Sequence, residues 1–459
     1  MAATLKLVRV ADFVSDVDTT DLLSTSGFYL SDWVEQVIPE GEDSVVETIS
    51  LRSVASNDDG LATLFQGLYT KFTQVGQAKD RAERYQIYLR DQLTAETAAR
   101  RAIVLSIRGE NGMGLHSFLV ATHHKTKFNL AIERGHWEAD TFTSQTPANI
   151  SGVGGLADTY AVTGTPAAVP GDLSARLRLL SFVPHAGSGA ISEIWWGFRT
   201  ARHCTLANWF GLWQLELGTA GTDTALATDA TASPGGGGNT KLQCNFDTVE
   251  AMASRVTLTP YQLSNSNYAD LRGTYQIVAR LRVDSGYICQ VKIGYGLPSG
   301  SFTYRDPITV DSTSNLDYDL GQITLPAGGP SSPYYSTMKS STIDLQAQLY
   351  SGTQDNGKYL HMDCLQAVPV DEGYGHLSGG AGVQGLVLID ALGRIEAYDG
   401  TDLTNTLETR GTNPKNCVVP PGLGKIIVVA QQAAISVLAD AVDLDYNFHP
   451  RYRGPRGGG

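Results

Sequence analysis

The sequence predicts a mostly β protein, built from several antiparallel β-sandwich or jelly-roll domains, with one or two short helices near the N-terminus. Three observations predict this fold class. Apolar and polar residues alternate in many short segments, which is typical of strands with one buried and one wet face. Glycine is abundant, at 49 of 459 residues, as many tight turns require. The helical signal is confined to the N-terminal region.

Residues 1–110 are expected to form an N-terminal β domain with one helix. An Asn/Asp cluster beginning at Asn57 is a good N-cap, and apolar residues at helical spacing follow as far as Phe72. Gly76 is a plausible end of this helix. A second short helix is expected at 95–101.

Three further regions follow, because a chain of this length predicts roughly 100–200 residues per domain. Residues 111–205 are expected to form a second β-sandwich region, and residues 206–370 a jelly roll. Residues 371–459 supply C-terminal strands and a basic tail that could pack back on an earlier domain.

The strand expected at 288–295 shows the alternation clearly. Gln290 and Lys292 point to one side, and Cys289 lies on the apolar side with its alternating neighbours. The five cysteines of the chain are widely spaced and include no CxxC pair. They indicate folding in a reducing cytoplasm, with cysteine used as a small apolar residue.

The net charge of -13 opposes binding to nucleic acid, which is itself a polyanion. The N-terminus has no signal-peptide pattern, and no apolar run approaches the roughly 18 residues of a membrane span. We therefore expect no membrane insertion and a route out of the producing cell other than secretion.

Motifs for catalysis are absent or incomplete in the sequence. Ser336 and Lys339 match an SxxK pattern, but no SDN or KTG triplet follows. His123 and His124 are adjacent, so on a strand they point to opposite faces and do not converge on a metal. We expect no enzyme, no catalytic residue, no cofactor and no metal site.

Aromatic and basic clusters are the candidates for an interface or a glycan site. Two adjacent tryptophans are expected to place one ring outward, two tyrosines lie in an expected loop, and a Pro/Gly-rich tail carries arginines that could dock on an acidic surface. The alternatives are that the rings cap hydrophobic cores and that the tail is loose and solvated. The candidates are Trp195, Trp196, Tyr334, Tyr335, Arg451, Tyr452 and Arg453.

The order of these segments resembles distal tail or minor tail proteins of tailed bacteriophages. Four parts of the sequence carry the resemblance. They are the strand–helix–strand passage at residues 45–108, the two segments 171–177 and 194–199, the stretch 271–369, and the closing strand with its tail at residues 449–453. The stretch 271–369 looks like a jelly-roll module similar to carbohydrate-binding domains.

The resemblance implies a structural virion protein near the tail tip that links the tail tube to tip proteins. It implies that residues 1–110 form a ring of copies, a hexamer by family resemblance, in contact with other tail proteins. The protein would be made in the host cytoplasm and located in the virion. One alternative is an adhesin whose jelly roll recognises a host surface glycan. The other is a glycan-processing enzyme, which would need two carboxylates flanking a cleft.

Overall fold

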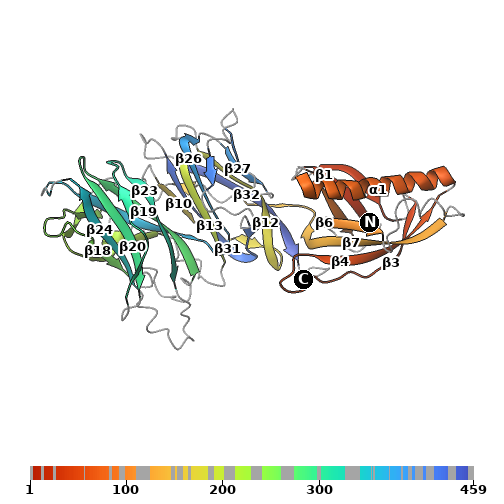
Figure 1. The fold of residues 1–459 in the computed structure, drawn as a ribbon, viewed down its shortest axis with the longest axis horizontal. Helices are drawn as coiled ribbons and strands as arrows, with labels where there is room; N and C mark the ends of the chain where they lie inside the picture. The colour runs from red at the N-terminus through yellow and green to blue at the C-terminus, as the bar shows by residue number, and fades with distance from the viewer. Residues whose placement is uncertain are drawn as a thin grey trace. The chain divides into compact units, whose positions relative to one another are not determined.

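The computed structural model describes residues 4–11, 15–23, 27–55, 57–81, 85–92, 99–109, 125–145, 150–151, 159–163, 167–184, 191–200, 212–228, 240–259, 273–296, 301–325, 342–352, 354, 357–371, 373–383, 386–390, 395–398, 407–409, 418–432 and 441–452. These residues form antiparallel sheets and one α-helix (Figure 1), which confirms the predicted mostly β class.

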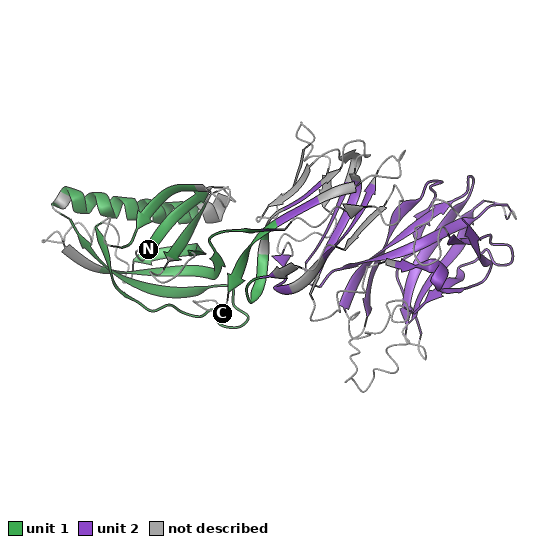
Figure 2. Ribbon diagram, turned by 180° about the vertical axis from the view of Figure 1, so that it is seen from behind, with its two compact units in different colours: residues 1–143, 170–178, 447–459 green, residues 144–169, 179–446 purple. Residues whose placement is uncertain are grey.

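The chain divides into two compact units (Figure 2). Unit 1 comprises residues 1–143, 170–178 and 447–459, and unit 2 comprises residues 144–169 and 179–446. The finer division predicted at residues 110, 205 and 370 stays a prediction.

Unit 1 contains an antiparallel sheet in the order β2-β1-β5-β6-β7-β4-β3. Its strands are β1 (Thr4–Ala11), β2 (Ser15–Asp21), β3 (Phe28–Trp33), β4 (Val45–Val54), β5 (Tyr85–Gln92), β6 (Arg100–Gly109) and β7 (Lys125–Ala139). β4 pairs with β7 as far as Arg134, and beyond that point the end of β32 (Ala441–Tyr452) pairs with Trp137 and Glu138. β7 is therefore the centre of the unit.

Helix α1 (Asp58–Arg81) covers one face of this sheet. Asn57 caps it, because the Asn57 Oδ1 accepts a hydrogen bond from the backbone N–H of Gly60 at 2.7 Å. The buried face of α1 consists of Leu61, Phe65, Leu68 and Val75. The predicted end at Gly76 is wrong, since the helix continues to Arg81. One glycine lowers helix stability by only about 1 kcal/mol, which tertiary packing can outweigh.

The second helix expected at 95–101 lies mostly outside the described residues. Arg100 and Arg101, which are described, belong to strand β6, so the expectation is wrong at those two positions. Both form polar contacts within unit 1 that a strand can provide.

Unit 2 contains a two-sheet sandwich. The β19 sheet has the order β16-β17-β25-β19-β23, with β14 also on β25, and the β20 sheet has the order β15-β18-β24-β20-β21, with β22 also on β20. The bounds are β14 (Leu212–Gln214), a 3-10 turn (Leu215–Leu217), β15 (Thr219–Ala220), β16 (Thr224–Thr228), β17 (Thr240–Cys244), β18 (Ala253–Leu258), β19 (Gly273–Val283), β20 (Ile288–Gly296), β21 (Thr303–Tyr304), β22 (Ile308–Val310), β23 (Leu316–Leu325), β24 (Thr342–Ser351) and β25 (Leu360–Pro369).

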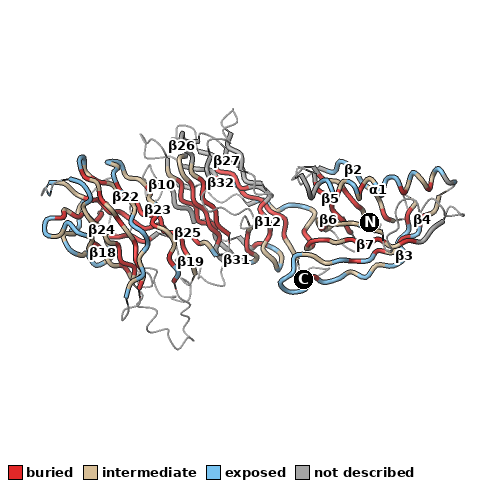
Figure 3. The backbone as a smooth tube through the Cα atoms, viewed as in Figure 1, coloured by how far each residue is buried: buried red, intermediate tan, exposed pale blue. Residues whose placement is uncertain are grey.

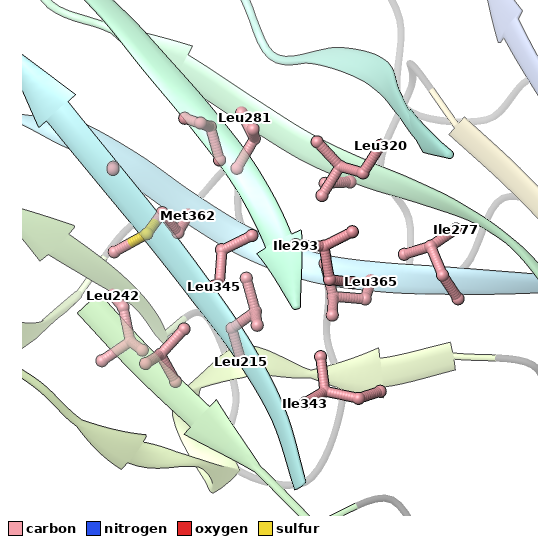
Figure 4. Close-up of a cluster of buried hydrophobic side chains, with 14 of the residues drawn as sticks. Leu215, Leu242, Ile277, Leu281, Ile293, Leu320, Ile343, Leu345, Met362 and Leu365 are labelled. Carbon is pink, nitrogen blue, oxygen red and sulfur yellow. The ribbon is translucent and has the colours of Figure 1, made fainter. Parts of the chain in front are cut away.

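The inner faces of these two sheets meet in one core (Figure 4). Leu281 and Met362 come from the β19 sheet, and Ile293 and Leu345 come from the β20 sheet. Buried residues, red in Figure 3, follow the strands that line this core. Cys289 is buried and unpaired, as the alternation predicted.

A third sheet of unit 2, the β13 sheet, has the order β10-β31-β13-β26-β29, with β11 also on β31. One of its faces packs on the β19 sheet, where Trp195, Tyr374 and Val429 contact Val278 and Val368. The bounds are β10 (Thr159–Thr163), β11 (Ala167–Val169), β13 (Ile191–Thr200), β26 (Tyr374–Val383), β29 (Leu407–Thr409) and β31 (Gly422–Gln432).

The remaining strands are short, apart from β12 and β32, whose residues belong partly to each unit. Within unit 2, β12 pairs with β27 and β27 pairs with β28. The bounds are β8 (Thr143–Gln145), β9 (Ile150–Ser151), β12 (Leu173–Pro184), β27 (Leu386–Asp390), β28 (Ile395–Tyr398) and β30 (Val418–Val419).

Candidate functional site: an apolar edge of unit 1

Exposed apolar side chains gather at the β3 end of the unit 1 sheet. We define the β3 surface as Tyr29, Leu30, Val34, Val37 and Val46, whose exposed fractions run from 36% to 64%. Tyr29 and Leu30 lie on β3, which pairs with β4, and the backbone N–H of Gln36, between Val34 and Val37, donates to Glu47, the residue after Val46. A group of this kind marks an interaction surface more often than single exposed residues do.

Strand β3 is an edge of the sheet in the part of the chain that the structure describes, where it pairs with β4 only. Phe28 is buried, but the four residues that follow it are exposed on both faces of the strand. The pairing register also shifts between Leu30 and Asp32. An edge strand with unpaired backbone groups and exposed apolar side chains tends to recruit another chain unless it is covered.

The segment after β3 is held from its inner side by the carboxylate of Glu47. The Trp33 Nε1 donates to one oxygen of Glu47 at 2.9 Å, and the backbone N–H of Gln36 donates to the other at 2.8 Å. Arg134 forms an ion pair with Glu47, and both side chains are almost fully buried. Arg134 also donates to the carbonyl of Gln36 at 2.8 Å. The backbone that carries Val34 and Val37 is thus fixed by buried, charge-assisted bonds.

A second arginine fixes the same segment through Glu35. Arg100 contacts Glu35 and Asp91, both at 2.9 Å, and its guanidinium lies 4.3 Å from the centre of the Trp137 ring. Arg134 lies 4.6 Å from the same ring. Burial raises the pKa of Glu35, although the charge of Arg100 opposes that shift. Two cations on one aromatic ring make this corner rigid, so the valines are presented with little entropy left to lose on binding.

The adjacent tryptophans of the sequence analysis are both fully buried, so the expectation that one ring faces outward is wrong. Trp195 stacks on His376 with ring centres 4.6 Å apart. Trp196, on the opposite face of β13, packs against Phe182 and across Gly375, where an added Cβ would lie 1.8 Å from the indole. The β13 sheet is therefore covered on both faces, which an unbroken apolar run from 194 to 198 already indicates.

The basic C-terminal residues divide between described and undescribed positions. Arg451 and Tyr452 belong to β32 and pair with Glu138 and Trp137, so at these positions the alternative of a loose tail is wrong. Arg451 donates to the carbonyl of Ser174 at 3.3 Å and lies 3.7 Å from Glu138. Arg453 lies outside the described residues, as do Tyr334, Tyr335, His123, His124 and the SxxK segment.

The described residues contain no grouping of three or more His, Cys, Asp or Glu residues that could hold a metal ion. No helix in this part of the chain has the length and apolarity needed to cross a membrane.

Sequence reasoning missed the β3 surface. Val34 and Val37 look like ordinary core residues in a linear pattern, because whether a strand is an edge depends on the order of strands in the sheet. The one local signal is that Tyr29 and Leu30 are adjacent and apolar, so they cannot both face one core.

No family model matches the chain, and no curated protein matches it. Among solved structures, the chain is similar to the phage P2 baseplate in its activated conformation with Ca, at 7% identity over 97% of this chain and 98% of that chain, with a TM-score of 0.25. It is also similar to the CBM22-1 xylan-binding domain of Paenibacillus barcinonensis Xyn10C, at 14% identity over 35% of this chain and 94% of that chain, with a TM-score of 0.22. A Paenibacillus xanthan lyase matches at 10% identity over 89% of this chain and 53% of that chain, with a TM-score of 0.26. These identities and TM-scores are low, so the likenesses assign neither a family nor a function.

Proposed function

We propose that the protein is a structural component of a tailed-phage virion. In this proposal it is a distal or minor tail protein that assembles with copies of itself near the tail tip and links the tail tube to tip proteins. It acts by burying surface against partners, without catalysis and without a cofactor. The observation that carries the proposal is the β3 surface, a rigid apolar edge that has no cover within the described part of unit 1.

Assembly into a ring requires contacts between two different surfaces of neighbouring copies. Unit 1 has two edges at opposite ends of one sheet, because β2 pairs with β1 only, among the described residues, and β3 pairs with β4 only. Val17 on β2 is also exposed. The β3 surface of one copy can therefore meet a surface other than itself on the next copy, and such contacts close a ring where the rotation between copies allows it.

The proposal is tested by the mass of the purified full chain in solution, with negative-stain images of the particles. Wild type should form oligomers that dissociate at low protein concentration. The double variant Val34→Asp/Val37→Asp should stay monomeric with an unchanged circular dichroism spectrum, because it places two charges on the β3 surface. The matched control is Leu217→Asp/Leu226→Asp, which charges two equally exposed apolar residues of unit 2 and should assemble as wild type does.

Two results would count against the proposal. A wild-type chain that remains monomeric at the highest attainable concentration removes self-assembly. Oligomers that are lost in the unit 2 control but kept in the unit 1 variant place the interface elsewhere.

A further inference from the structure

The segment that presents the β3 surface contains a carboxylate with only one of its two oxygens bonded. Glu35 lies between Val34 and Val37, just after β3, and its side chain is 15% exposed. Its Oε2 accepts a hydrogen bond from Arg100 at 2.9 Å. Its Oε1 is buried and accepts no hydrogen bond from the described residues. A buried carboxylate oxygen without a donor is costly, because nothing replaces the water that it has lost.

The cation beside Glu35 is shared with a second carboxylate. Arg100 on β6 donates to the Oδ2 of Asp91 on β5 through two nitrogens, at 2.9 Å and 3.2 Å. The Asp91 side chain is 3% exposed, so it is more deeply buried than that of Glu35. The guanidinium of Arg100 is therefore not available to Glu35 alone, and it neutralises Glu35 only in part.

The other charged pair at this corner is complete without Glu35. Glu47 on β4 accepts from Trp33 on one oxygen, from the backbone N–H of Gln36 on the other, and pairs with Arg134 of β7. The charge of Arg134 lowers the pKa of Glu35 and the charge of Glu47 raises it, so the two effects oppose each other. Burial remains the largest influence on the pKa of Glu35, and it raises that pKa.

A partner on the β3 surface would remove the water that Glu35 still contacts, because Val34 and Val37 lie on either side of it in the chain. Loss of water disfavours the charged form of a carboxyl group and favours the protonated form. We propose that assembly through the β3 surface takes up a proton at Glu35, so that copies associate more tightly as the solution becomes more acidic. This inference rests on the proposed function, since it requires the β3 surface to be the interface.

The direction of the effect follows from proton linkage. If the pKa of Glu35 is higher in the assembled chain than in the separate chain, the assembled chain binds more protons between the two values. Association then tightens as the pH falls through that window. His136 also lies in unit 1 close to Arg134, but its pKa of about 4 keeps it neutral at pH 5.5 and above. It therefore does not contribute to the expected effect over this range.

Dilution calorimetry of the full chain at pH 5.5 and pH 8, in two buffers of different ionisation enthalpy, gives both the association constant and the number of protons bound. Wild type should associate more tightly at pH 5.5, by up to about tenfold if the pKa of Glu35 rises by about one on assembly. It should also take up a fraction of a proton per contact. Glu35→Gln imitates the protonated side chain and keeps an acceptor for Arg100. It should bind at pH 8 as tightly as wild type does at pH 5.5, without proton uptake.

Two matched variants separate this effect from other consequences of removing a carboxylate. Asp306→Asn removes the same charge from an exposed position in unit 2 and should keep the pH dependence of wild type. It shows whether a general decrease of the net charge of -13 is the cause. Glu47→Gln should weaken association at both pH values, because both oxygens of Glu47 already have donors.

Equal association of wild type at the two pH values overturns the inference and leaves the proposed assembly intact. A folded Glu35→Gln variant, checked by circular dichroism, that associates more weakly than wild type at pH 8 also overturns it, because Glu35 would then only anchor the segment. A wild-type chain that never assembles contradicts the proposed function as well, so the two failures are distinct.

Discussion

The sandwich of unit 2 and the sheet of unit 1 cover their apolar faces and their edge strands in different ways. In the sandwich each sheet buries its inner face against the other, and two of the edge strands, β15 and β21, are only two residues long. In unit 1 the helix covers one face of the sheet, but the edge strands β2 and β3 have seven and six residues and carry exposed apolar side chains. Short edges limit unwanted pairing, whereas long apolar edges invite it. Within the described residues, the β20 sheet of the sandwich therefore ends in strands too short to pair with another chain, whereas the unit 1 sheet ends in longer apolar strands.

The two regions also use a buried arginine differently. Arg255 in the sandwich is fully buried and donates to four backbone carbonyls, those of Thr222, Val249, Ala251 and Ala347, and to the Asp223 carboxylate. It acts as an internal cation that holds two loops on β24. Arg134 in unit 1 holds the segment that presents the β3 surface. Arg255 therefore stabilises the interior of the sandwich, whereas Arg134 stabilises the segment that presents the β3 surface.

The largest expected effect is that of Arg255→Ala. It leaves Asp223 and four carbonyls without their cation, and removing one partner of a buried pair costs about 3–5 kcal/mol. Urea unfolding of the full chain, followed by amide exchange in β18 and β24, should show this loss. Arg305→Ala, at an exposed position, should leave the same amides unchanged. Equal protection in both variants would remove the role assigned to Arg255.

Glu47→Gln should cost unit 1 about 2–3 kcal/mol, because Arg134 then keeps only neutral partners and its buried charge is unbalanced. Unlike Arg255→Ala, it should also weaken assembly, since it loosens the segment that carries Val34 and Val37. Sedimentation equilibrium at a urea concentration where Glu47→Gln and Arg255→Ala both remain folded separates the loss of stability from the loss of assembly. If both variants assemble equally well, the anchoring of the β3 surface is not needed.

A smaller effect is expected from pH: the free energies of unfolding of the two regions should change with pH in opposite directions, each by on the order of 1 kcal/mol. Burial lowers the pKa of His136 in unit 1 from 6.5 to about 4, helped by the charge of Arg451. The unfolded chain then binds more protons between these values, so the free energy of unfolding of unit 1 falls as the pH drops below 6.5. Burial raises the pKa of Glu216 in the sandwich from 4.5 to about 7, and Asp363 adds to the shift. The folded chain then binds more protons, so stability is lost as the pH rises from 4.5 through 7.

The measurement is urea unfolding of each region at pH 5 and pH 8. His136→Gln should remove a loss of stability on acidification, and Glu216→Gln should remove a loss on alkalinisation. Because both side chains are partly exposed, solvent screening keeps each effect well below the full shift. Differences of the same sign in the two variants would contradict these assignments.

The sequence was informative where one face of a strand meets one core. Cys289 and its apolar neighbours in β20 are buried, with Gln290 and Lys292 on the other side, as the alternation predicted. It was misleading at Trp195 and Trp196, because β13 is covered on both faces and alternation no longer separates inside from outside. It could not indicate the β3 surface, because that surface depends on which strands become neighbours, and sequence periodicity does not contain that information.

Hydrogen exchange at two protein concentrations, one where the chain assembles and one where it does not, shows whether β3 is the edge that other copies cover. We expect the amides of β3 and of residues 34–37 to gain protection on assembly, while those of β16 and β21 exchange at the same rate in both samples. Protection that appears in the sandwich and not at β3 would show that the β3 surface is not the interface.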